Sequence, residues 1–176
     1  MNNIFIEPSK DKWNGIIQRP VIDSRPLEAA VTVILEDVKQ NGDAAVKKYA
    51  LQFDKVKLSD LKVSEAEIKE AAALVSDELK EAIQIAKDNI TKFHSLQKET
   101  VQQVETMNGV VCWRRPVAIQ KVGLYIPGGT APLFSTLLML GVPALLAGCN
   151  EVVVCTPCDK NGKVNAVVLY TAQLIG

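Results

Sequence analysis

The sequence predicts an α/β protein in which amino-terminal helices precede a β-hairpin and an unfinished parallel βαβ unit. Three observations predict this class. Apolar residues recur at helical spacing through most of residues 1–100, an Asn-Gly pair lies in an extended stretch at 108–109, and two short apolar runs flank a long apolar helix between 122 and 155. A parallel sheet needs several strands and cover on both faces, so we expect this sheet to be incomplete.

The pattern centres on the segment VGLYIPGGTAPL. Apolar residues alternate in its first part, residues 122–126, which predicts a strand. Pro127-Gly128-Gly129 should end that strand, because proline has no N–H to donate and glycine reaches positive φ at little cost. Thr130 is the predicted N-cap and Pro132 fits the first turn of a helix that extends over residues 131–148.

A second strand is predicted at Val152–Cys155, which completes a strand, helix, strand unit. Tyr125 lies one residue before the end of the first strand, near the sheet edge where open α/β sheets bind ligands. The helix N-terminus behind the glycines offers free N–H groups to a phosphate or carboxylate. The spacing is not G-x-G-x-x-G, so the residues alone favour a tight turn over a ligand site.

The amino-terminal helices are predicted mainly from their caps. Ser24 should cap a helix that has Pro26 in its first turn and ends at Asn41-Gly42, and Asp43 should cap the next, which ends near Leu51. Two further helices follow, one with a capping box formed by Ser64 and Glu67, and the longest with its cap at Ser76.

The later elements are predicted from turn residues and proline. Asn108-Gly109 predicts the hairpin, and the extended chain should continue to Val117. Pro143 should kink or split the long apolar helix, because it removes a backbone hydrogen bond and clashes with the preceding turn. Asn165 should cap a last helix that ends near Leu174.

Composition excludes several classes of protein. The chain has 20 Lys and Arg against 20 Asp and Glu, so nothing indicates a nucleic-acid or anionic-membrane partner. No signal segment is visible, and the apolar run at 131–149 is interrupted by prolines and adjoins a strand, which favours a buried helix over a membrane span. The four cysteines are therefore expected to be reduced thiols in the cytoplasm.

Several long stretches resemble one enzyme family. VGLYIPGGTAPLFSTLLMLGVPALLAGC, NITKFHSLQ, VETMNGVVCWRRPV, VVVCTPC and LYTAQLIG are similar to segments of histidinol dehydrogenases, in the family's order. The family enzyme is much longer, so the chain is expected to be its N-terminal portion. The resemblance implies a helical region at residues 1–100 and, at 101–176, a hairpin followed by the first part of a truncated, Rossmann-like NAD-binding domain.

The resemblance also implies an activity. The full-length parent would oxidise L-histidinol to L-histidine with NAD and zinc, as a homodimer whose active sites are built from both subunits. Tyr125 matches the family tyrosine that contacts NAD, and Gly128 and Gly129 would let the backbone approach the cofactor. The family's Glu-His pair and zinc ligands do not occur here, so no catalytic or metal residue is expected and this chain alone should be inactive.

Other candidate residues are weaker. Cys155 and Cys158 form one C-x-x-C, but a second one is missing and Cys112, Cys149 and His94 would have to complete a site by folding, so zinc is not expected in this chain. His94 fits a hydrogen-bonded boundary residue, and Arg114-Arg115 fits solvated surface. Two alternatives remain for function: a paralogous NAD-dependent dehydrogenase of another small alcohol, and a non-catalytic folded module.

Overall fold

The structure is a computed structural model that describes residues 4–19, 23–128 and 132–176. The chain divides into two units, residues 1–46 and residues 47–176. The second unit contains the parallel strands, and helices from before residue 100 belong to it as well. The domain boundary expected at residue 100 stays a prediction about the whole protein.

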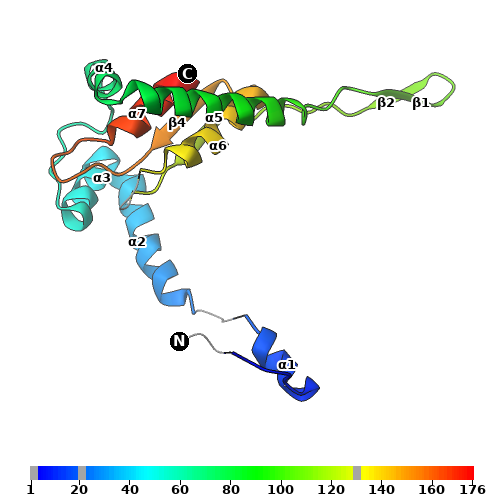
Figure 1. Ribbon diagram of the computed structural model, residues 1–176, viewed down its shortest axis with the longest axis horizontal. Coiled ribbons are helices and arrows are strands. Elements are labelled where there is room, and N and C mark those ends of the chain that lie inside the picture. Colours follow the sequence, from blue (N-terminus) through cyan, green and yellow to red (C-terminus); the bar gives the residue numbers. More distant parts are fainter. Residues whose placement is uncertain (1–3, 20–22, 129–131) are drawn as a thin grey trace. The chain divides into compact units, whose positions relative to one another are not determined.

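The predicted βαβ unit is present. Strands β3 (Lys121–Tyr125) and β4 (Glu151–Cys155) pair in parallel, with Val122 opposite Val152 and Tyr125 opposite Cys155, and α6 (Phe134–Ala147) connects them. Burial alternates along both strands, so one face of the pair is half-buried and the other is exposed. The parallel sheet therefore has only these two strands in the described residues, and only one of its faces is covered, as expected of an incomplete sheet (Figure 1).

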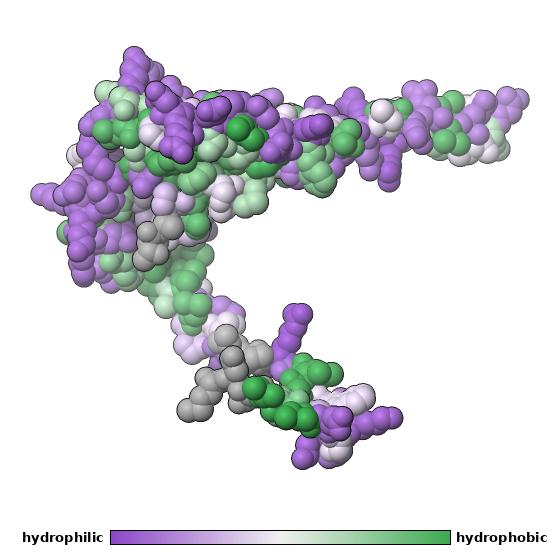
Figure 2. Space-filling view, viewed as in Figure 1, coloured by the Kyte–Doolittle hydropathy of each residue, from purple (hydrophilic) through white to green (hydrophobic). Residues whose placement is uncertain are grey.

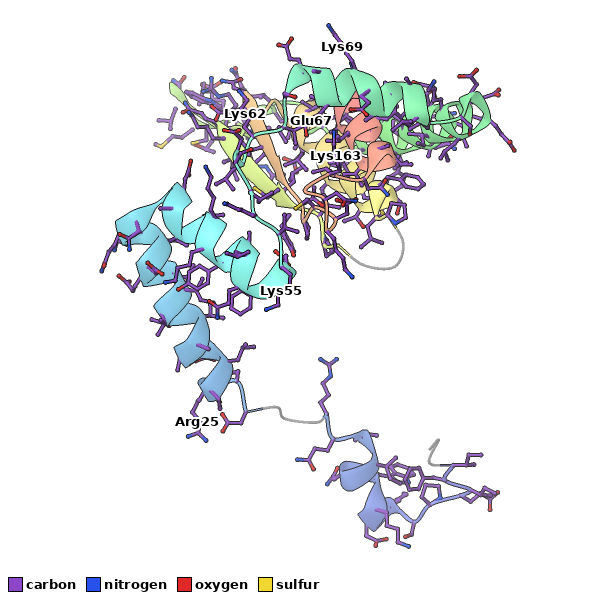
Figure 3. All side chains as sticks on the ribbon, turned by 90° about the vertical axis from the view of Figure 1, so that its left-hand side faces the viewer. Arg25, Lys55, Lys62, Glu67, Lys69 and Lys163 are labelled. Carbon is purple, nitrogen blue, oxygen red and sulfur yellow. The ribbon has the colours of Figure 1, made fainter. Side chains whose placement is uncertain are left out.

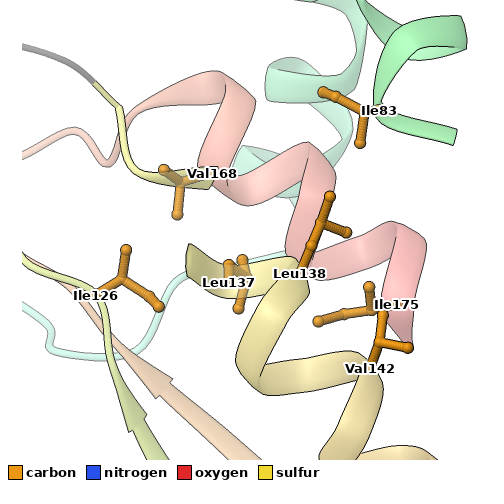
Figure 4. Packing of buried hydrophobic residues seen from close by; sticks show 7 residues of the cluster. All are labelled: Ile83, Ile126, Leu137, Leu138, Val142, Val168 and Ile175. Carbon is orange, nitrogen blue, oxygen red and sulfur yellow. The ribbon is translucent and has the colours of Figure 1, made fainter. Parts of the chain in front are cut away.

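The core of the second unit lies where three helices meet the covered face of the sheet. Helices α5 (Asp77–Ser95) and α7 (Ala166–Ile175) both pack against α6. The buried cluster, shown in Figure 4, consists of aliphatic side chains: Ile83, Ile126, Leu137, Leu138, Val142, Val168 and Ile175. Only 5% of the residues are aromatic, so aliphatic side chains must fill most of the space between elements.

Local hydrogen bonds fix the starts of three helices as predicted. Ser64 and Glu67 form a reciprocal capping box at the start of α4 (Glu65–Leu74), which packs against α7. Ser76 Oγ accepts from the N–H of Leu79 at the start of α5, and Asn165 Oδ1 accepts from the N–H of Val167 at the start of α7.

The predicted hairpin is present and is exposed throughout. Strands β1 (Gln103–Met107) and β2 (Val110–Trp113) are antiparallel and meet at the Asn-Gly turn. The hairpin projects beyond the end of α5 (Figure 1), and hydrophobic residues lie among the polar ones on its surface (Figure 2). The strand ends at Trp113, four residues before the predicted extended stretch does.

The first unit is mainly helical. It contains α1 (Lys10–Ile17), for which the sequence offers no strong signal, and α2 (Arg25–Asn41), which ends at Gly42 as predicted. Ser24 precedes α2 but its hydroxyl donates to the Glu28 carboxylate, so it makes no side-chain cap. Helix α3 (Asp43–Tyr49) begins as predicted and continues into the π-helical turn η1 (Ala50–Asp54), beyond the expected end at Leu51.

Helix α6 differs from the prediction at its start and in being unsplit. The helix begins at Phe134 with Leu133 as its N-cap, so Pro132 lies before the helix, and Thr130 lies outside the described residues. Leu133 and Phe134 both pack against the core cluster, and this packing determines the start. The helix is not split at Pro143, which lies inside it, since the loss of one hydrogen bond is offset by the burial of Val142 and its neighbours; a kink there stays a prediction. No helix in the described ranges is long and apolar enough to cross a membrane.

Candidate functional site

A pocket of about 770 Å³ opens at the carboxyl ends of β3 and β4. The loops that follow the two strands form one side of it, through Pro127, Gly128, Thr156 and Pro157. Both loops reach the same pocket because parallel strands end at the same edge of a sheet. Ligands of open α/β sheets bind at this edge, so the pocket lies where the strand pattern predicts a site.

Tyr125 lies at this pocket as the last residue of β3. Its side chain is on the exposed face of the sheet, and 64% of the residue's surface is accessible. Tyr125 is therefore not a core aromatic in this structure. An exposed tyrosine at a pocket offers a ring face for stacking and a hydroxyl for hydrogen bonding.

Gly128 lines the same pocket, but it does not use the conformation predicted for it. Its φ is not in the left-handed region, so a positive φ is not why glycine stands here. A Cβ built on Gly128 would lie 3.1 Å from Cγ and 3.3 Å from Cβ of Pro157, which is closer than ordinary contact. A side chain at this position would require the two loops to separate by a few tenths of an ångström. Gly129 lies outside the described residues.

Two helices begin at the pocket. Leu133, the N-cap of α6, and Asn165, the N-cap of α7, both line it. The first N–H groups of an α-helix have no partner within the helix and lie at the positive end of its dipole. The pocket therefore offers donors to an anionic or hydroxyl-bearing ligand from two elements.

Part of the pocket lining, from α4 and from the end of the loop between β4 and α7, is charged. Lys163 Nζ lies 3.3 Å from Oε2 of Glu70, which is on α4, and Glu67 of the same helix also lines the pocket (Figure 3). The backbone N–H of Ser64, then its hydroxyl and the charge of Lys163, hold the pKa of Glu67 below its ordinary value. Carboxylates outnumber the single lysine in this part of the lining, so it favours hydroxyl donors such as those of a sugar over a phosphate.

The lysine is presented by a tight loop between β4 and α7. The carboxylate of Asp159 accepts from the backbone N–H groups of Asn161 at 2.8 Å and Lys163 at 2.9 Å. These two bonds hold the pKa of Asp159 below its usual value, because they favour the charged carboxylate. The side chain of Asp159 thus holds the backbone of this loop in one conformation.

The cysteines do not form a recognisable reactive site. Cys155 is exposed and Cys158 is half-buried, and both are free thiols. Burial is the main reason that the pKa of Cys158 is raised, and the charges of Asp54 and Asp159 raise it further. Across the described ranges, no group of three or more His, Cys, Asp and Glu side chains is placed to hold a metal ion. The expectation about zinc in this chain stays a prediction.

His94 and Arg114 take the structural roles expected of them. Nδ1 of His94 lies 2.7 Å from Oε1 of Gln97, and its ring makes an edge contact with Phe93. Arg114 pairs with Glu99 at 3.0 Å, and both side chains are largely exposed. Neither residue is part of the pocket.

Comparisons with known proteins agree with one another. The family model of histidinol dehydrogenase matches residues 17–176. The chain is 54% identical over 176 residues to histidinol dehydrogenase from Bacteroides thetaiotaomicron, covering 100% of this chain and 41% of that protein. A histidinol dehydrogenase from Vibrio vulnificus is 46% identical over 167 residues, covering 94% of this chain and 38% of the relative.

The crystal structure of histidinol dehydrogenase from Elizabethkingia anophelis superposes with a TM-score of 0.92 at 51% identity, covering 98% of this chain and 40% of that one. The chain belongs to the histidinol dehydrogenase family. It spans about two fifths of the length of these relatives, so the expectation that it corresponds to part of the family enzyme is confirmed. The α/β fold inferred from the resemblance is confirmed by the same superposition.

Reasoning from the sequence did not identify the residues that α4 contributes to the pocket of this histidinol dehydrogenase segment. Glu67 and Glu70 reach it from α4, more than 50 residues before the strands, and no local pattern links them to the site. The loop residues Pro157, Asp159 and Lys163 had a usable signal, since they directly follow a predicted strand and share its carboxyl end.

Proposed function

We propose that the protein containing this chain oxidises L-histidinol to L-histidine, with NAD⁺ as the hydride acceptor and zinc at the catalytic centre. The observation that carries the proposal is the 54% identity to a histidinol dehydrogenase along the whole chain. NAD⁺ accepts a hydride when it is bound, and histidinol needs two successive hydride transfers to become the acid.

We propose that this chain contributes part of the NAD⁺ site and none of the catalytic groups. Tyr125 would stack on or hydrogen-bond to the cofactor, and Gly128 and Gly129 would shape the turn beside it. The lining of the pocket fits a dinucleotide. It combines an exposed aromatic ring, the starts of two helices and carboxylates that can accept hydrogen bonds from ribose hydroxyls.

We further propose that the acid–base pair and the zinc ligands lie in parts of the protein outside this chain, so that the chain alone is inactive. A homodimer in the cytoplasm is the proposed state of the whole protein. The exposed hydrophobic residues of the hairpin support an additional protein contact there, among them Val104, Met107 and Trp113, which are more than half exposed.

The decisive experiment is an assay of the full-length protein with histidinol, NAD⁺ and zinc, in which NADH is followed by absorbance. We expect two NADH for each histidinol consumed, and no NADH from residues 1–176 alone. If the protein does not oxidise histidinol but oxidises another small alcohol, such as a sulfonated diol, it is the paralogous dehydrogenase. A full-length protein without any dehydrogenase activity would support the non-catalytic module.

A further inference from the structure

The two strand loops meet at a single close contact, between Gly128 and Pro157. The last backbone bond between the strands is donated by Ile126 N–H to the carbonyl of Cys155, at 2.9 Å. The contact of Gly128 with Pro157 lies two residues further along each loop. Because Gly128 has no Cβ, the proline ring can occupy the space that a side chain would fill, with three of its carbons within 3.7 Å of that position.

The partner in this contact is rigid. The ring of proline is bonded to its own backbone nitrogen, so Pro157 cannot rotate away from Gly128 as a flexible side chain could. The ring can change its pucker but cannot swing aside. A methyl group added at position 128 would therefore push the two loops apart by a few tenths of an ångström.

Both loops line the pocket together with Tyr125. A change in the spacing between Gly128 and Pro157 would move the edge of the pocket relative to the tyrosine ring, whereas the pairing of β3 with β4 would persist. Cofactor affinity depends on such placement, because a gap of about 0.5–1 Å already costs a contact roughly a quarter to a half of its dispersion energy.

We propose that Pro157 is a positioning residue, which packs into the space left by Gly128 and thereby holds the pocket at the width that the dinucleotide requires. This inference rests on the proposed NAD⁺ function. It assigns the need for glycine at 128 to the proline of the neighbouring loop, instead of to direct approach of the cofactor.

The test is a double-mutant cycle in the full-length enzyme, comparing wild type, Gly128→Ala, Pro157→Ala and the double variant. Gly128→Ala should raise the KM for NAD⁺ roughly 5- to 30-fold, with a smaller change in kcat and in the KM for histidinol. Pro157→Ala alone removes the nearest ring carbon and should raise the KM for NAD⁺ by roughly 2- to 5-fold. In the double variant the 3.1 Å contact with Cγ is gone and only the 3.3 Å contact with Cβ remains, so the KM should fall from that of Gly128→Ala most of the way toward that of Pro157→Ala.

Rescue separates the two explanations for the glycine. If Gly128→Ala is folded, as judged by circular dichroism, and Pro157→Ala does not rescue it, then the methyl blocks the cofactor directly and the inference is overturned. An unchanged KM in Gly128→Ala also overturns it. If Gly128→Ala does not fold, Pro157→Ala alone decides, and an unaltered KM for NAD⁺ would contradict the role. A wild-type enzyme that does not use NAD⁺ would instead refute the proposed function.

Discussion

Among the described glycines, Gly141 has the shortest distance from a built Cβ to a neighbouring atom, where α6 packs against α7, and this contact predicts a measurable energetic coupling. A Cβ added to Gly141 would lie 2.3 Å from Cδ1 of Ile175, whereas the next atoms, Cγ1 of Ile175 and Cδ1 of Leu124, lie at 3.6 and 3.8 Å. One methyl group therefore accounts for the whole clash. Ile175 is 9% exposed and belongs to the core cluster, so it has little free space to move into.

The size of the coupling follows from the expected change in the free energy of unfolding for each variant. Overpacking of a core costs about 1–3 kcal/mol, and replacing a helical glycine by alanine gains about 1 kcal/mol, so Gly141→Ala should be destabilising by about 0–2 kcal/mol. Ile175→Val removes Cδ1 and should cost about 0.5–1.5 kcal/mol. In the double variant the clash is gone, so its loss of stability should be smaller than the sum of the single losses by about 1–3 kcal/mol.

Urea unfolding of the four proteins, followed by far-ultraviolet circular dichroism, measures the free energies of unfolding that the cycle needs. Losses that add to within about 0.3–0.5 kcal/mol would show that Gly141 and Ile175 are not coupled. The close approach of α6 to α7 would then be wrong.

Three further predictions concern caps, thiols and metal. Ser64→Ala should destabilise the chain by about 0.5–2 kcal/mol in the same unfolding assay. The pKa of Glu67 in the folded chain lies below the ordinary value of 4.5. The stability that its charged form contributes should therefore be present above pH 4.5 and be lost as the pH falls through the lower folded pKa. A stability that rises on acidification would refute that role. Cys158 should react with iodoacetamide more slowly than free cysteine at pH 8, since burial raises its pKa. A faster rate, measured by mass-spectrometric mapping, would contradict this. Purified chain should hold no stoichiometric zinc by elemental analysis, and one equivalent that is lost on changing Cys155 and Cys158 to serine would overturn the expectation.

The sequence predicted features that depend on near neighbours in the chain. The caps at Ser64, Ser76 and Asn165 were predicted correctly because a capping side chain bonds to a backbone group two or three residues away. The Asn-Gly turn and the positions of the two strands β3 and β4 were predicted from equally local patterns, the turn residues and the alternation of apolar residues. The start of α6 was predicted wrongly, because Leu133 is placed by its packing against the core and not by cap chemistry.

The candidate site was predictable only in part. Tyr125 was found because its strand ends at the sheet edge where ligands bind. Gly128 lies at the pocket as the turn pattern indicated, but without a positive φ, and its close contact with Pro157 of another loop could not be predicted from the local sequence. Glu67 and Glu70 could not be found, because their approach to the pocket follows from how α4 packs on α7, a contact distant in sequence.

The central claim is that the pocket at Tyr125 holds NAD⁺, and the kinetics of Tyr125 variants in the full-length enzyme test it most directly. Tyr125→Ala removes the ring and the hydroxyl, and Tyr125→Phe is the matched control that keeps the ring. Because the side chain is 64% exposed, neither change should greatly affect folding. Loss of one such contact costs about 1–3 kcal/mol, so Tyr125→Ala should raise the KM for NAD⁺ roughly 5- to 150-fold and the KM for histidinol much less. An unchanged dependence on NAD⁺ in Tyr125→Ala would contradict the account and leave Tyr125 as a surface residue of the strand.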